Sequence, residues 1–214
     1  MKLEESNNLS IESEQLLIVE GQDEKGFFAA LLKYLDINTV QIINVAGREN
    51  LKNTLESLSI ITNFDKVTHI GFVFDAEKNE AKSTFQSFES NLKKIFPAEC
   101  IPKKSGNVVK AEIACGIFIM PDNKRSGMLE DLCLDSVKHT SLFPIADSYV
   151  QNAKMLQSES DKEKYNIHKA LLQTYLAGLP KICNTIRVAV AKNVFDFENI
   201  VFSEIKKFLK DLYL

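Results

Sequence analysis

The sequence has few of the residues that build zinc sites or disulfide frameworks. Its 214 residues include four cysteines and three histidines. No Cys-x-x-Cys pair occurs among them, and the histidines follow no ligand spacing. Zinc sites need closely spaced ligands, so no zinc site is expected. We expect the cysteines to be reduced and mostly buried, as in a protein of the cytoplasm.

Two nucleotide-binding motifs are also missing. The chain contains neither a Gly-x-x-x-x-Gly-Lys-Ser/Thr phosphate loop nor a Gly-x-Gly-x-x-Gly dinucleotide turn. Both motifs bring backbone N–H groups close to phosphates, and the first also supplies a lysine. The chain is therefore not expected to act as an ATPase by itself.

Neither an excess of positive charge nor a long apolar run is present. The formal net charge is −3, whereas domains that coat nucleic acid through bulk electrostatics are usually strongly basic. Any contact with nucleic acid must then be local. The acidic, polar opening of the chain is unlike a signal peptide, and no apolar run approaches membrane-spanning length, so no membrane association is expected.

What the sequence does contain is an apolar run, residues 16–19, that ends abruptly on Glu20-Gly21-Gln22-Asp23-Glu24. A short continuous apolar run with β-branched residues towards its end is typical of a central parallel strand covered on both faces. Ligands of open α/β sheets bind outside the carboxyl ends of the strands. The acids that follow this run are therefore expected at a ligand-binding edge.

A second apolar run, residues 69–74, ends in the same way on Asp75-Ala76-Glu77. If the chain stays extended beyond the strand, the two-residue period directs Asp75 and Glu77 to the same side. Together with Glu20 and Glu24 they would form a pocket rich in carboxylate oxygens. Carboxylates held close together repel one another unless a hard cation neutralises them, and Mg²⁺ is the natural candidate.

Strand and helix patterns alternate along most of the chain. Apolar runs predict four strands, at residues 16–19, 39–45, 69–74 and 113–120, separated by segments of helical periodicity. Such alternation predicts an α/β fold with a mostly parallel, Rossmann-like four-stranded sheet flanked by helices. We expect residues 1–14 to be a flexible segment and residues 15–214 to be a single domain. Residues from about 141 to 214 would be a helical C-terminal extension.

The order of these features resembles a TOPRIM domain, the fold used by topoisomerases, primases and nucleases. The likeness rests on an apolar strand that enters Glu-Gly-x-Asp-Glu and a later strand that enters Asp-x-Glu. With the later Gly127-x-x-Glu130, it is most similar to TOPRIM nucleases of the overcoming-lysogenization-defect (OLD) class. It also resembles small stand-alone prokaryotic TOPRIM-like proteins of unassigned function. The likeness extends from about residue 15 to the C-terminus, but Glu77 stands where such families usually have an aspartate.

The resemblance implies a nuclease that hydrolyses phosphodiester bonds of DNA or RNA with two Mg²⁺ or Mn²⁺ ions. Its implied metal ligands are Glu20, Glu24, Asp75, Glu77 and Glu130. Glu20, Asp75 and Glu77 would also be catalytic, together with Lys169, which would stabilise developing phosphate charge. Asp131 competes with Glu130, and Lys164 competes with Lys169.

Four further cations are candidates for substrate binding. Arg48 follows the second predicted strand, where an arginine could grip a phosphate. Lys103, Lys104 and Lys110 lie in a basic, turn-rich, hairpin-like segment. For all four, a solvated surface charge is the alternative interpretation.

A second functional reading remains open. The same fold could be a non-catalytic scaffold that binds metal or phosphate and serves as a partner subunit. Because nucleases of the OLD class carry an ATPase domain on the same chain, this protein could work with a separate ATPase, as in antiphage defence, or as a homodimer. A housekeeping RNA-processing factor is a third possibility.

Overall fold

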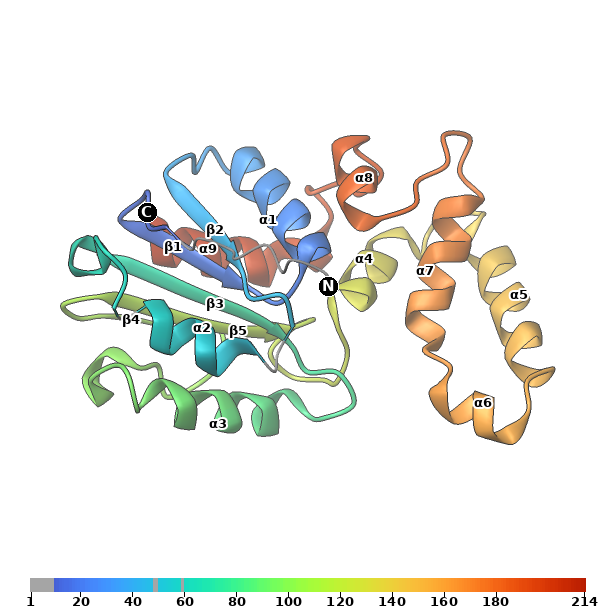
Figure 1. The fold of residues 1–214 in the computed structure, drawn as a ribbon. Helices are drawn as coiled ribbons and strands as arrows, with labels where there is room; N and C mark the ends of the chain where they lie inside the picture. Colours follow the sequence, from blue (N-terminus) through green and yellow to red (C-terminus); the bar gives the residue numbers. More distant parts are fainter. Residues whose placement is uncertain (1–9, 48–49, 59) are drawn as a thin grey trace, which may run out of the picture.

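The computed structural model describes residues 10–47, 50–58 and 60–214. In this part of the chain a five-stranded sheet lies between two layers of helices, and a group of helices extends beyond one end of the sheet (Figure 1). The strands are β1 (Gln15–Val19), β2 (Val40–Asn44), β3 (His69–Asp75), β4 (Val108–Lys110) and β5 (Ala114–Met120). Their order in the sheet is β2-β1-β3-β5-β4.

The predicted mostly parallel sheet is confirmed, with one strand more than expected. β1 pairs in parallel with β2 and β3, and β3 pairs in parallel with β5. The additional strand is β4, which pairs antiparallel with β5 at the edge of the sheet. It falls within the segment expected to be hairpin-like. With 3 residues, it is too short for its periodicity to reveal it in the sequence.

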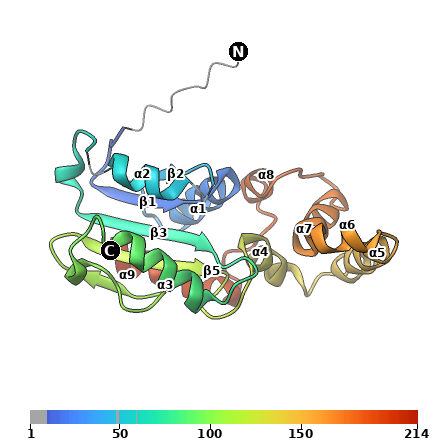
Figure 2. The same ribbon diagram turned by 60° about the horizontal axis from the view of Figure 1, so that its bottom comes forward.

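The central strands are buried on both faces, as their continuous apolar runs predict. Leu17 and Val19 of β1 face one cluster of core residues, whereas Leu16 and Ile18 face the other. Helices α1 (Gln22–Tyr34) and α9 (Ser203–Tyr213) cover the first face, and α2 (Leu51–Leu58) and α3 (Ala81–Leu92) cover the second. This arrangement is visible in two views (Figures 1 and 2).

The chain connections place a topological switch between β1 and β3. From β1 the chain crosses one face through α1 to reach β2, and from β2 it crosses the other face through α2 to reach β3. Helices on opposite faces leave a crevice outside the carboxyl ends of the two strands. The acids that follow β1 and β3 lie at this crevice.

The C-terminal helices have two different positions. Helix α9 packs on the sheet, where the Tyr213 hydroxyl donates a hydrogen bond of 2.7 Å to the carbonyl oxygen of Leu16. Beside the sheet, a helical lobe consists of α5 (Phe143–Met155), α6 (Glu159–Lys164) and α7 (Ile167–Ala177) (Figure 1). The remaining helices of the described chain are α4 (Leu129–Val137), α8 (Ile186–Ala191) and the short 3-10 helices η2 (Phe64–Lys66), η3 (Ala98–Cys100) and η4 (Ile200–Phe202). Helix α4 lies between the sheet and the lobe, and α8 packs on α1.

All four cysteines are buried and have free thiols in the described part of the chain, in agreement with the absence of Cys-x-x-Cys pairs. Among the described residues, no helix has the length and apolar character needed to cross a membrane.

Candidate functional site

A cavity of about 860 Å³ lies at the carboxyl ends of β1 and β3. Among the described residues, its acidic lining comes from the ends of the two strands and from the first turns of α1 and α4. The acidic residues are Glu20, Asp23, Glu24, Asp75, Glu77 and Glu130. The structure thus brings together all five carboxylates expected to bind metal, and it adds Asp23.

Asp75 is the most deeply buried carboxylate of this cavity. As the last residue of β3 it is 9% exposed. Burial raises its pKa well above the ordinary value, and the nearby carboxylates of Glu24, Glu130 and Glu20 raise it further. The backbone N–H of Leu129 donates a hydrogen bond of 3.0 Å to Oδ1 of Asp75, which partly offsets this effect. Asp75 is therefore costly to ionise unless positive charge enters the cavity.

Glu24 and Glu130 occupy equivalent places in two helices. Each lies in the first turn, Glu24 in α1 and Glu130 in α4. Burial is the largest cause of a raised pKa in both, although Lys169 lowers each pKa. Acids in a first turn often only complement the helix dipole. Here they also line the cavity, and the Lys169 Nζ lies 3.7 Å from Oε1 of Glu130.

Glu77 reaches the cavity by a different backbone path from the one predicted. The expectation of an extended chain past Asp75 is wrong, because Glu77 has a φ of 55° in the left-handed region. Its N–H donates to the Gly127 carbonyl oxygen at 2.7 Å, and the Gly127 N–H donates back at 2.8 Å. This bridge fixes an exposed Glu77 at the rim of the cavity.

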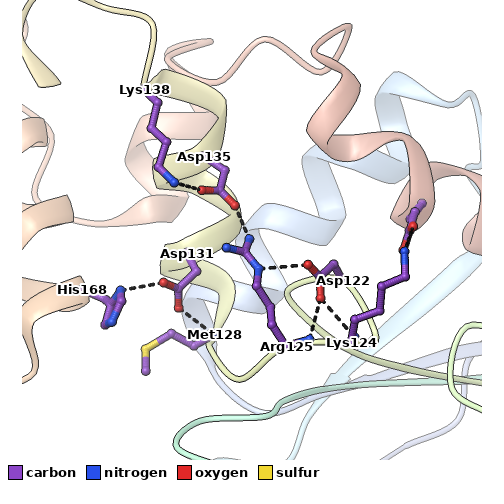
Figure 3. Close-up of polar contacts among 9 residues, drawn as sticks. Asp122, Lys124, Arg125, Met128, Asp131, Asp135, Lys138 and His168 are labelled. Carbon is purple, nitrogen blue, oxygen red and sulfur yellow. Dashed lines mark hydrogen bonds and ion pairs between the residues drawn. The ribbon is translucent and has the colours of Figure 1, made fainter. Parts of the chain in front are cut away.

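The loop that carries Gly127 is tied to α4 by ion pairs (Figure 3). Arg125 donates through Nε to Oδ2 of Asp122 at 2.9 Å and pairs through its other end with Asp135 of α4. Asp135 also pairs with Lys138 at 2.5 Å. These contacts hold the loop that positions Glu77, although none of these four residues lines the cavity.

Asp131 has a structural position rather than one in the cavity. Its Oδ2 accepts a hydrogen bond of 2.8 Å from the N–H of Met128, which closes the first turn of α4. Its Oδ1 lies 2.6 Å from Nδ1 of His168 in α7 (Figure 3). Asp131 is outside the cavity lining, whereas Glu130 is part of it. The Asp131–His168 pair joins α4 to α7 of the helical lobe, and Lys169 is the next residue of α7.

The donor chemistry of the cavity fits a hard divalent cation. Its candidate ligands are carboxylate oxygens, which suit Mg²⁺ or Mn²⁺. The raised pKa values of Asp75, Glu24 and Glu130 follow from burial and mutual repulsion, which a bound cation would relieve. In the described part of the chain, no three or more Asp, Glu, His or Cys side chains are already grouped closely enough to hold a metal ion. The carboxylates share a cavity, but their side chains are not arranged as a closed ligand set.

Three cationic side chains from the described part of the chain line the same cavity. Lys169, expected from the sequence, is joined by Lys78 and Arg187. No motif marks Lys78 or Arg187 in the sequence, since Lys78 lies in a polar loop and Arg187 in a short, mostly apolar helix. Arg48 lies outside the described residues. Lys164 does not line the cavity.

The other predicted substrate-binding lysines are not in this cavity. Lys110 pairs with Ala114 at the start of β5, whereas Asp75 pairs with Met120 at its end. At roughly 3.3 Å per residue, the two positions are about 20 Å apart along the sheet. Lys110 instead lines a separate cavity of about 640 Å³ with Lys207 and Lys210.

Lys103 and Lys104 lie nearer to the acidic edge of the sheet than Lys110 does. They belong to the loop before β4, and the next residue, Ser105, donates a hydrogen bond of 3.5 Å to the carbonyl oxygen of Asn123. This contact joins their loop to the one that ends at Gly127. Both lysines are exposed, and neither lines the acidic cavity.

The sequence matches the model of one protein family over most of its length. The family model described as "Protein of unknown function (DUF3226)" matches residues 14–214. The chain belongs to this family. No curated protein matches the sequence. This DUF3226 member is also similar to solved structures of two proteins. Its α/β class is shown by its own strand order.

One of these is the C-terminal region of the Xanthomonas campestris pv. campestris OLD protein, phased with mercury. It is 12% identical, covers 94% of this chain and 96% of that chain, and has a TM-score of 0.48. The other is the hypothetical protein PH0156 from Pyrococcus horikoshii OT3. It is 16% identical, covers 92% of this chain and 94% of that chain, and has a TM-score of 0.41.

Proposed function

We propose that this DUF3226 protein is a TOPRIM-type nuclease that hydrolyses phosphodiester bonds of DNA or RNA with Mg²⁺ or Mn²⁺. The observation that carries the proposal is the cavity at the switch between β1 and β3, which the five proposed carboxylate ligands share with Lys169. The residue pattern that resembles TOPRIM nucleases of the OLD class supports the same reaction. We also propose that it acts in antiphage defence or in nucleic-acid processing. Its partner would be a separate ATPase or a second copy of this chain.

Each group of residues has a role set by its charge. Glu20, Glu24, Asp75, Glu77 and Glu130 would hold the metal. When bound, a divalent cation supplies electrophilic stabilisation of the phosphate and lowers the pKa of water. Phosphoryl transfer depends mainly on positioning and electrostatics, so no nucleophilic side chain is required.

Lys169 would act on the phosphate itself. Its exposed side chain lies 3.7 Å from Glu130, a separation that is long for a hydrogen bond. The ammonium can therefore turn towards an incoming phosphate without losing a short ion pair. There it would neutralise negative charge that develops on the phosphate oxygens during hydrolysis.

Cleavage of labelled DNA and RNA by the purified protein tests the proposal. We expect products with Mn²⁺ or Mg²⁺ and none with a chelator. Asp75→Asn should abolish the activity, whereas Asp65→Asn, which removes an exposed carboxylate before β3, should leave it unchanged. Equal rates for both variants would assign any cleavage to a contaminant and remove the nuclease proposal.

The second candidate, a non-catalytic scaffold, is favoured by one observation. Among the residues described, the carboxylates of the cavity are not grouped as a ready ligand set. A scaffold would bind metal or nucleic acid in the same assays without any turnover. Binding that depends on Asp75, with no cleavage under any metal condition, would select this alternative.

A further inference from the structure

Arg187 lines the acidic cavity, and its guanidinium forms no ion pair with any other residue that the structure describes. It enters the cavity from α8. Lys169, by contrast, faces Glu130 at 3.7 Å. Among the residues that the structure describes, the Arg187 guanidinium makes no hydrogen bond or ion pair, and only its backbone N–H has a polar contact, with Asp23. A guanidinium that lies in a cavity with six described acids and pairs with none of their carboxylates is available to an anionic ligand.

The aliphatic part of Arg187 is held in a gap on α1. A Cβ atom added to Gly26 would lie 2.5 Å from Cγ and 2.6 Å from Cβ of Arg187, so only glycine leaves room for this side chain. Gly26 lies inside α1, where glycine costs about 1 kcal/mol relative to alanine. The close packing of Arg187 against α1 explains why glycine occupies position 26.

The backbone of Arg187 makes a second contact with α1. The N–H of Arg187 donates a hydrogen bond of 3.2 Å to Oδ1 of Asp23, in the first turn of α1. Thr185 caps α8 by accepting a hydrogen bond from the N–H of Val188 at 3.2 Å. Helix α8 is thereby attached to α1 next to the cavity, and the direction of Arg187 follows from this attachment.

We propose that Arg187 binds a phosphate group of the nucleic-acid substrate in a bidentate manner, and that Gly26 is the positioning residue for it. The inference rests on the proposed function. A cavity lined by carboxylates repels phosphates, so substrate binding needs cations in addition to the metal. The planar guanidinium matches two phosphate oxygens at once, which a lysine ammonium cannot do.

The test measures binding separately from cleavage. Fluorescence anisotropy of a labelled oligonucleotide in Ca²⁺ gives a dissociation constant, and a parallel assay in Mn²⁺ gives cleavage rates. The variants are Arg187→Lys, Arg187→Ala and Gly26→Ala. Lys181→Ala is the matched control, because it removes an exposed positive charge close to α8 that does not line the cavity. Circular dichroism checks folding.

We expect Arg187→Ala to weaken binding by about 10-fold to 100-fold, the loss of a charge-assisted pair of hydrogen bonds. Arg187→Lys should bind almost as weakly, although its salt dependence stays close to that of the wild type because the charge is kept. Gly26→Ala should weaken binding in the same direction. Lys181→Ala should bind like the wild type.

The outcomes separate this inference from the nuclease proposal. Wild-type affinity of Arg187→Lys would show that charge alone matters and would overturn the bidentate contact, even if Gly26→Ala failed to fold. Wild-type protein that binds without cleaving would remove the nuclease proposal but leave the Arg187 series valid. Wild-type protein that binds no nucleic acid would remove both.

Discussion

The carboxylate of Asp75, the last residue of β3, accepts a hydrogen bond of 3.0 Å from the backbone N–H of Leu129, the first residue of α4. The bond links the central strand to the helix whose first turn carries Glu130. The bond therefore holds the side chain of one candidate metal ligand next to the helical turn that carries another. The same bond holds the buried Asp75 carboxyl group next to other carboxylates, and this has consequences for stability.

Metal-free Asp75→Asn should be more stable than the metal-free wild type at neutral pH. Asparagine keeps an oxygen for the Leu129 N–H but cannot ionise, so it avoids both the cost of burying a charge and the repulsion by Glu24, Glu130 and Glu20. A gain of about 1 kcal/mol would raise Tm by about 2–4 °C in a chain of this size. Asp65→Asn, an exposed control, should change Tm little. A lower Tm for Asp75→Asn would show that this repulsion does not limit stability.

The stability difference between these two proteins should depend on pH. The pKa of Asp75 is raised in the folded state, so the folded protein keeps a proton that the unfolded chain has lost. Stability from this group is present at low pH and is lost as pH rises from about 4 through the raised folded pKa. The advantage of Asp75→Asn should therefore vanish in acid and grow towards neutral pH. Denaturant unfolding at several pH values measures it, and a constant difference would contradict the pKa argument.

Mg²⁺ or Mn²⁺ should raise the Tm of the wild-type protein. A ligand that binds only the folded state stabilises it in proportion to the logarithm of its concentration relative to Kd. At 100 times Kd the gain is about 2.7 kcal/mol. The double variant Glu20→Gln, Asp75→Asn should show no such rise. An equal rise in the double variant would place the bound metal outside this cavity.

Glu77→Asp should keep or increase metal-dependent cleavage, in contrast to Asp75→Asn. Glu77 has a φ of 55°, a backbone conformation that aspartate tolerates better than glutamate. The change also restores the Asp-x-Asp pattern usual in the families that the sequence resembles. Cleavage rates of the three proteins in Mg²⁺ decide this. A loss in Glu77→Asp as severe as in Asp75→Asn would mean that the longer side chain is required at the rim.

The three lysines of the basic segment, Lys103, Lys104 and Lys110, should differ in their effect on nucleic-acid binding. Lys103→Ala with Lys104→Ala should weaken binding and reduce its salt dependence, because their loop contacts the loop that ends at Gly127. Lys110→Ala should have little effect, since Lys110 lies beside the start of β5, whereas the acids lie at the carboxyl ends of the parallel strands. Anisotropy titrations at several salt concentrations separate the two. A larger effect of Lys110 would instead point to the cavity that it shares with Lys207 and Lys210.

The parallel strands and the acids at their ends could be predicted from sequence because both depend on local pattern. A buried strand needs a continuous apolar run, and the carboxyl ends of parallel strands meet at one edge. Glu20 and Asp75 each follow such a run directly, so both could be assigned to the cavity edge. Strand β4 could not be predicted in this way, since its 3 residues carry too little periodicity.

Glu130 and Asp131 show where local pattern stops being informative. They are neighbours in the first turn of α4, and either could have faced the cavity. Asp131 is instead used by the Met128 N–H and by His168, which leaves Glu130 on the cavity side. The choice depends on α7, a helix more than 30 residues further along the chain.

The sequence by itself determined the α/β class, the parallel central strands and the edge at which the carboxylates gather. Only the tertiary structure decided three positions. These are the left-handed turn at Glu77, the place of Lys110 beside the start of β5, away from the acids, and the place of Arg187 beside Gly26. The physical reason is range. Strand burial follows from a few adjacent side chains, whereas these three positions depend on contacts between segments far apart in the chain, such as Glu77 with Gly127 and Arg187 with α1.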